Sequence, residues 1–194
     1  MILYLIIGLI IIAGIYLMST YNYFVSTKTR VGAAIQEIGN QLKRQADLIP
    51  NLEASVKGYL KHEKGIFEAL TEARKSVASA VKSGSVSKMA EAGKMLNDVL
   101  PKIQVVVESN PQIKGNEVVK DLMDELRDTS DKVMYARRLM IDLTADYNVK
   151  IATFPSNLVA NLFNFGLLKG FETPDSGDVS SVSEAETKTP KINL

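Results

Sequence analysis

The sequence contains no cysteine, no tryptophan and a single histidine among its 194 residues. Without cysteine, the chain has no disulfide, no thiolate nucleophile and no cysteine metal ligand. Its 23 basic and 22 acidic residues give a formal net charge of +1, so it lacks the basic excess typical of nucleic-acid-binding proteins. These absences exclude thiol chemistry and indicate that nucleic acid is not a partner.

Groups that carry catalysis are equally scarce. His62-Glu63 is the only fragment similar to a zinc-protease motif, but that motif needs a second histidine four residues later, and Ile66 stands there. Adjacent acids such as Asp124 and Glu125 point in different directions on a helix. The sequence has no glycine-rich phosphate loop, no serine nucleophile elbow and no second histidine to serve as a base. It therefore predicts a protein that is not an enzyme, without a catalytic residue, metal site or cofactor.

Hydrophobic residues are concentrated at the start of the chain. The stretch from Ile2 to Met18 carries no charge, and 17 residues in a helix span about 26 Å. Continuing to Phe24 gives about 35 Å, enough to cross a hydrocarbon core of about 30 Å. A cleaved signal peptide is disfavoured because no basic side chain precedes the stretch and no small-residue cleavage site follows it. Residues 1–24 are therefore predicted to be a transmembrane anchor.

The charges that flank the anchor predict its orientation. Only Met1 precedes it, whereas Lys28, Arg30, Lys43 and Arg44 follow it. By the positive-inside rule, the short N-terminus lies outside and the rest of the chain lies in the cytoplasm. We expect a single-pass protein of the cell membrane, with Lys28 and Arg30 as its juxtamembrane basic residues.

Apolar residues then recur every three or four positions, which is the spacing of amphipathic helices. The first run extends from Val31 to Ile49 and is predicted to end at Pro50. A second extends from Leu52 to Val77 and a third from Met89 to Val107, where the internal Pro101 predicts a kink or a break. The fold class is predicted to be all-α: a transmembrane helix followed by an antiparallel bundle of about four long helices.

The fourth run is the most regular. Its members, spaced three or four apart, are Val118, Leu122, Leu126, Thr129, Val133, Ala136, Met140, Leu143 and Tyr147. Asn116 precedes this run and is a predicted N-cap. Such a seam serves an intramolecular bundle and a coiled coil equally well, so a homo-oligomer stays open.

The end of the chain changes character after Phe154-Pro155-Ser156-Asn157, which is predicted to stop the fourth helix. Leu158 to Phe171 is apolar with only Lys169 charged, and it either folds back on the bundle or lies in the membrane interface. Residues 172–194 are rich in Ser, Thr and acids and are predicted to be a disordered tail. Residues 25–171 are thus assigned to the helical bundle.

One polar cluster is a candidate site. Gln41, Arg44, Asp47 and Asn51 lie near the predicted end of the first run. Arg44 and Asp47 are three residues apart and can pair on one helix face, and Asn51 is placed to cap the next helix. The cluster is interpreted either as a polar lock that fixes the turn or as a site for a partner or an anionic ligand.

A specific string carries a resemblance to a known family. Residues 41–52 read QLKRQADLIPNL, and further matches follow the same order along the chain: Tyr21-Asn22, Ala73-Arg74, Ala136-Arg137-Arg138, Asp146-Tyr147-Asn148 and Phe154-Pro155-Ser156-Asn157. This pattern resembles the LemA family over roughly residues 1–171. In two departures, Gln45 occupies a position that is usually basic, and Phe163-Asn164-Phe165 replaces Phe-Gly-Phe.

The resemblance implies a bacterial-type protein with one membrane helix, a cytoplasmic helical bundle and no established enzymatic activity. It also implies a role in membrane organisation, as in magnetosome formation. We therefore expect a helical scaffold or adaptor with protein partners that the sequence does not identify. The alternative is a membrane-surface module, in which Lys28, Arg30, Lys43 and Arg44 meet anionic lipid and the apolar segment after Asn157 enters the interface.

Overall fold

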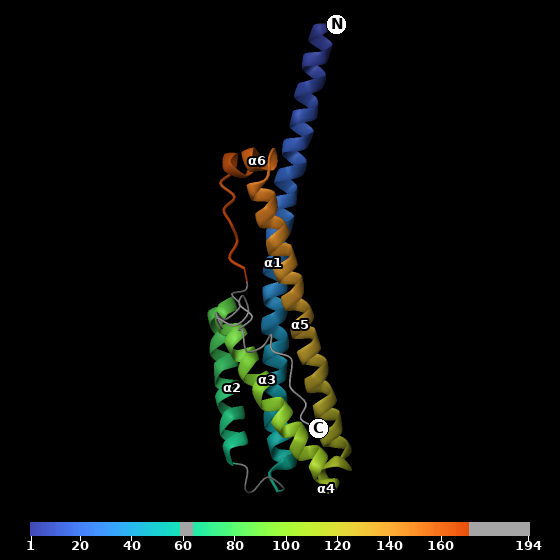
Figure 1. Ribbon diagram of the computed structural model, residues 1–194, viewed down its shortest axis with the longest axis vertical. Helices are drawn as coiled ribbons and strands as arrows, with labels where there is room; N and C mark the ends of the chain where they lie inside the picture. The colour runs from blue at the N-terminus through green and yellow to red at the C-terminus, as the bar shows by residue number, and fades with distance from the viewer. Residues whose placement is uncertain (59–63, 171–194) are drawn as a thin grey trace, which may run out of the picture.

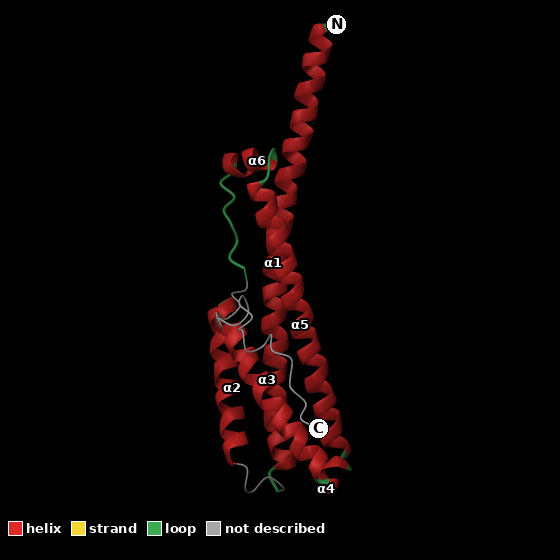
Figure 2. Cartoon of the chain, in the orientation of Figure 1, coloured by secondary structure: helices red, strands yellow, loops and turns green. Residues whose placement is uncertain are grey.

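The computed structural model describes residues 1–58 and 64–170, and within these ranges it contains six helices and no strand. The helices are α1 (Ile2–Val56), α2 (Lys64–Ser83), α3 (Val86–Ser109), α4 (Pro111–Lys114), α5 (Glu117–Ala152) and α6 (Ser156–Leu162). Short loops join α2, α3, α4, α5 and α6 in succession (Figure 2). The all-α prediction is confirmed. The predicted tail, 172–194, and His62 lie outside the described residues.

The first helix combines the anchor and the first amphipathic run. α1 is 55 residues long, about 83 Å, and its N-terminal part projects alone from the rest of the molecule (Figure 1). It is the one described helix that is long and apolar enough to cross a membrane. Nearly every side chain up to Ser19 is exposed, and Thr20 is the first buried residue. The part that packs with the other helices, from Thr20 of α1 to Gly170, is called the helical body below.

The prediction that a helix ends at Pro50 is wrong. α1 continues through Pro50 to Val56. Proline removes one backbone donor and strains the preceding turn, but Ile49 and Leu52 on either side are both completely buried. Tertiary packing of the apolar face outweighs the local cost. Asn51 consequently lies inside α1 and caps no helix.

Helices α2 and α3 form a hairpin around a single glycine. Gly84 adopts a φ of +63°, which a residue without Cβ reaches at no steric cost. The Ser85 side chain accepts a hydrogen bond from the backbone N–H of Lys88 and caps α3. α3 then passes through Pro101 without a break and ends at Ser109, before Asn110-Pro111.

The regular seam was largely predicted correctly. Asn116 caps α5, and its side-chain oxygen accepts from the backbone N–H groups of Val118 and Val119 at 3.0 and 3.4 Å. The first seam position is shifted by one residue, because Val118 is 59% exposed whereas Val119 is fully buried. From Leu126 to Tyr147 most of the predicted positions are buried.

Helices α1 and α5 are antiparallel, because Phe24 meets Tyr147 near one end of the pair and Gln45 meets Leu126 towards the other. α2 and α3 lie together along the other side of α1 (Figure 1). A large aliphatic core fills the space between these helices and includes Ile38, Leu42 and Leu96. A smaller, aromatic core lies nearer to the anchor.

That aromatic core holds a corner where the chain reverses after α5. The Phe154–Pro155 peptide bond is cis, and the Ser156 hydroxyl hydrogen-bonds the carbonyl oxygens of Lys150 and Thr153, at the C-terminal end of α5. α6 then lies across the long axis of the molecule, beside the point where α1 leaves the body (Figure 1). Beyond α6, the backbone of Leu168 exchanges two 2.9 Å hydrogen bonds with the Asn148 side chain. As far as Gly170, the apolar segment therefore folds back on the helical body.

Candidate interaction groove between α3 and α5

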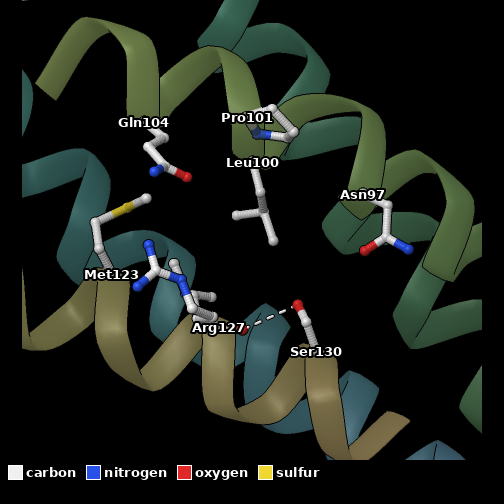
Figure 3. Close-up of a pocket in the computed structure, with 8 residues that line it drawn as sticks. Asn97, Leu100, Pro101, Gln104, Met123, Arg127 and Ser130 are labelled. Atoms are coloured by element: carbon white, nitrogen blue, oxygen red, sulfur yellow. Dashed lines mark hydrogen bonds between the residues drawn. The ribbon is translucent and has the colours of Figure 1, made fainter. Parts of the chain in front are cut away.

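A hollow in the described surface lies between α3 and α5. It has a volume of about 220 Å³ and is lined by Asn97, Leu100, Pro101, Gln104, Met123, Leu126, Arg127 and Ser130. In Figure 3, Leu100 and Gln104 of one helix face Met123 and Arg127 of the other across the hollow. α3 packs mainly on α2 and α5 mainly on α1, which leaves this seam open.

Two further hollows extend it along the same seam. One of about 320 Å³ shares Gln104, Met123 and Arg127 with the first, and one of about 230 Å³ shares Asn97 and Ser130. Together their lining residues extend along α5 from Lys120 to Arg137, which is about 26 Å. We call these three neighbouring hollows together the α3/α5 groove.

The groove has an apolar floor and charged edges. Leu100, Met123 and Leu126 supply aliphatic surface near its middle. Acids and bases both line it, and Arg127 lies 3.7 Å from Asp124. An apolar centre with a polar rim is the arrangement found in many protein–protein interfaces. Within the described residues, no group of three or more His, Cys, Asp or Glu side chains could hold a metal ion.

A buried polar contact fixes the groove at its α1 side. The Gln45 amide donates to the Ser130 hydroxyl at 2.6 Å and approaches the Leu126 carbonyl oxygen at 3.4 Å. Gln45 is 2% exposed, so these bonds meet the requirement that a buried amide be paired. Sequence reasoning noted Gln45 only as a departure from a basic position. Its place in the buried stripe between Leu42 and Ile49 was the signal that it enters the core.

The predicted polar cluster is distributed over different neighbours. Arg44 pairs with Glu125 of α5, and no ion pair joins it to Asp47 among the described residues. Gln41 donates to Glu37 at 2.7 Å on the same helix. Asp47 and Asn51 are exposed. Arg44 therefore helps to hold α1 against α5.

Basic residues and aromatic rings meet near the anchor. Lys28 and Arg30 are exposed on α1, a few turns below the point where it leaves the body. Lys150 of α5 lies 4.6 Å from the centroid of the Tyr23 ring, in a cation–π contact. Close by, burial raises the pKa of the Tyr147 phenol. This end of the body joins positive charge to an aromatic surface.

Three of the strings that carried the family resemblance, Tyr21-Asn22, Asp146-Tyr147-Asn148 and Phe154-Pro155-Ser156-Asn157, lie together in space. Tyr21, Tyr147, Ser156 and Phe163 all lie at the corner near the anchor: Tyr21 and Phe163 are in edge-to-face contact at 4.8 Å. Asn164 adopts a φ of 55°, the left-handed region that glycine occupies most easily and that asparagine tolerates best among other residues. The replacement of the expected glycine by Asn164 is therefore compatible with the turn.

The long exposed apolar helix and the all-helical body are typical of a membrane-associated helical protein. Comparison with known sequences then identifies its family. The sequence profile of the LemA family matches residues 34–185, and the chain belongs to that family.

Curated relatives include magnetosome proteins. The chain is similar to Magnetosome protein MamQ of Magnetospirillum gryphiswaldense, with 23% identity over 190 residues, covering 86% of this chain and 70% of the relative. Magnetosome protein MamQ 1 and MamQ 2 of Paramagnetospirillum magneticum match with the same identity and coverage. The resemblance inferred from residues 41–52 is thus confirmed.

Proposed function

We propose that this protein is a non-enzymatic, single-pass membrane scaffold or adaptor that binds an amphipathic helix of a partner protein in the α3/α5 groove. The supporting observation is the groove itself, which extends about 26 Å along α5 and has an apolar floor near its middle, at Leu100, Met123 and Leu126. Relatives of the protein are named as magnetosome proteins, and a role in membrane or envelope organisation agrees with those names.

A helical partner fits the spacing of the groove walls. On α3 the lining residues Asn97, Leu100 and Gln104 recur after three and four positions, and α5 presents Met123, Leu126 and Ser130 at similar intervals. These rows repeat once per helical turn, which is the repeat with which a third helix interlocks. The charged edges supply Asp124 and Arg127 to fix the partner's register.

Site-specific photo-crosslinking tests this proposal in native membranes. A photoreactive amino acid at Gln104, which lines two of the three hollows, is compared with one at Val105. Val105 is the next residue of the same helix, is exposed and does not line the groove. We expect an adduct from position 104 whose partner peptide maps to an amphipathic helix of another protein, and no such adduct from position 105.

A groove variant gives the second arm. Leu100→Glu places a charge on the apolar floor and is expected to abolish the adduct at position 104 while the helical content stays unchanged. Identical adducts from positions 104 and 105, or an adduct only with a second copy of this chain, would contradict the adaptor proposal.

A further inference from the structure

The corner formed by α6 is placed at the level where α1 leaves the helical body. Thr20 and Phe24 of α1 are buried there, whereas residues before Thr20 are largely exposed. The ring centroid of Phe165, just after α6, lies 5.0 Å from that of Phe24, and the Phe163 ring contacts the Tyr21 ring. Since α1 would cross the bilayer with its exposed apolar part, the corner lies at the membrane surface.

Helix α6 has two unlike faces. Ser156, Val159 and Ala160 are buried against α1 and α5. The opposite face presents Leu158 and Leu162, four residues apart, which are 59% and 65% exposed. Phe154, in the turn before the helix, is 79% exposed. Three large apolar side chains within nine residues are thus left in contact with solvent.

Charge is absent from this part of the chain. The 18 residues from Ile151 to Leu168 include no acidic or basic side chain, and Lys150 and Lys169 bracket them. Elsewhere on the helical body, large exposed apolar residues are interspersed with charged ones, as Met134 and Tyr135 are between Lys132 and Arg137. The exposed face of α6 is therefore unusual for a surface that contacts only water.

We propose that α6 is a membrane foot: its outer face, formed by Phe154, Leu158 and Leu162, inserts into the interfacial layer of the bilayer that α1 crosses. The foot goes beyond the scaffold function, because it fixes how the helical body stands on the membrane. Two contacts with one bilayer, a spanning helix and a crosswise helix, restrict the tilt of the body, whereas a single helix leaves it free to swing.

The surroundings of the foot suit the boundary between lipid and water. Tyr21 places an amphipathic ring beside Phe163 at the level where interfacial aromatic residues are favoured. Lys150, held over Tyr23, lies on the body side, where it can approach lipid phosphates. A short apolar helix face buried at this depth is a recognised mode of interfacial binding. The occupant of the exposed face is therefore assigned as lipid rather than protein.

The absence of tryptophan allows a direct depth measurement on the full-length chain. A single tryptophan is introduced by Leu158→Trp, and the chain is reconstituted in phosphatidylcholine vesicles with acyl chains brominated near the headgroup. Ile12→Trp, inside the anchor, is the positive control. Tyr135→Trp, an exposed position on the middle of α5, is the negative control.

Bromine is expected to quench the fluorescence of Leu158→Trp at least half as strongly as that of Ile12→Trp. The fluorescence of Tyr135→Trp should be quenched only slightly. Quenching of Leu158→Trp no greater than that of Tyr135→Trp would overturn the foot. A second outcome would also overturn the proposal: the tryptophan of Leu158→Trp is shielded from aqueous acrylamide but is not quenched by bromine. If dilution of the protein in lipid then removes this shielding, a second copy of the chain covers the face.

A second variant guards against a local effect of the probe. The reporter is moved to Phe154→Trp, and Leu158→Asn and Leu162→Asn are introduced together at exposed positions where the fold does not depend on them. Bromine quenching of the reporter is expected to fall at least twofold, with unchanged helical content. Unchanged quenching would overturn the role of the leucine pair. The partner crosslink at Gln104 is measured separately, so the foot can fail while the adaptor function stands, and the reverse.

Discussion

The helical body contains two cores that differ in chemistry and in reach. The aliphatic core extends along α1, α2, α3 and α5 through residues such as Leu42 and Leu126. The aromatic core is compact and joins Phe24, Tyr147 and Ala160 at the corner near the anchor. A long seam spreads stability over many replaceable contacts, whereas a corner depends on a few rings and hydrogen bonds. We infer that the first core maintains the fold and the second positions the body on the membrane.

The largest effect is expected in the aliphatic core. Leu42 is 1% exposed. Its Cδ2 lies so near Gly93 of α3 that a Cβ at that glycine would be 3.5 Å away. Leu42→Ala removes buried methyl groups and leaves a cavity, and should lower the free energy of unfolding by about 3 kcal/mol. Denaturant unfolding of the full chain in detergent measures this change. The matched control, Leu158→Ala on the exposed face of α6, should lower the free energy of unfolding by less than about 0.5 kcal/mol. Equal losses in the two variants would refute the assignment of fold stability to the aliphatic core.

A comparable substitution in the aromatic core should act locally. Phe24 is completely buried and lies between Tyr147 and Phe165. Phe24→Ala forfeits about 3 kcal/mol of contacts that hold the corner, so hydrogen exchange of α6 amides should accelerate about 100-fold. Exchange in α3 should change far less. Uniform acceleration throughout the body would show that the two cores are one cooperative unit.

The hydrogen-bonded clamp after α6 gives a smaller effect in the same region. Asn148→Ala removes two side-chain bonds to the Leu168 backbone. At about 1 kcal/mol each, their loss should loosen residues 163–170 by about 2 kcal/mol. Hydrogen exchange or limited proteolysis reports this loosening. Asn22→Ala, an exposed asparagine on α1, is the control and should leave the segment protected.

The buried amide beneath the α3/α5 groove should contribute about 1 kcal/mol. Ser130→Ala deprives the Gln45 amide of its shorter hydrogen bond and leaves the longer one to the Leu126 carbonyl oxygen. Replacing both partners, as in Gln45→Leu with Ser130→Ala, should recover part of the loss, because no buried polar group is then left unpaired. A double variant that is less stable than the sum of its single changes would contradict this reason.

The smallest effect concerns pH. Burial raises the pKa of Tyr147, so the folded state keeps the phenolic proton when the unfolded chain loses it near pH 10. This contribution is fully present below pH 10 and is lost as the pH rises above it. The decrease in Tm between pH 8 and pH 10.5 should be smaller in Tyr147→Phe than in the parent chain. A decrease of the same size would show that Tyr147 ionises as easily in the folded state.

Local patterns predicted individual helices well. The spacing from Leu122 to Tyr147 and the cap at Asn116 gave α5 nearly as it is, because these features depend on neighbours within one helix. The prediction that the helix ends at Pro50 was wrong because it used only local information. The local cost of proline is overcome by the burial of Ile49 and Leu52 in contacts with distant residues. Periodicity also continued into Leu52 and Val56, and it was the more reliable signal.

The candidate sites were harder to predict than the helices. Arg44 was expected to pair with Asp47, three residues away, but its partner Glu125 is 81 positions along the chain. The α3/α5 groove exists only because α3 packs on α2 and α5 on α1, and no single segment encodes that arrangement. The apolar character of the segment from Leu158 was recognised, whereas its crosswise placement beside Tyr21 required the structure.

We propose, from the basic residues that follow the anchor, that α1 holds the helical body on the cytoplasmic side of a membrane. Because the chain has no cysteine, one can be introduced by Ser87→Cys at an exposed position in the first turn of α3, far from the anchor. Intact and lysed cells are treated with a membrane-impermeant maleimide. We predict labelling only after lysis. Labelling of intact cells would contradict the orientation and place the groove and its partner outside the cytoplasm.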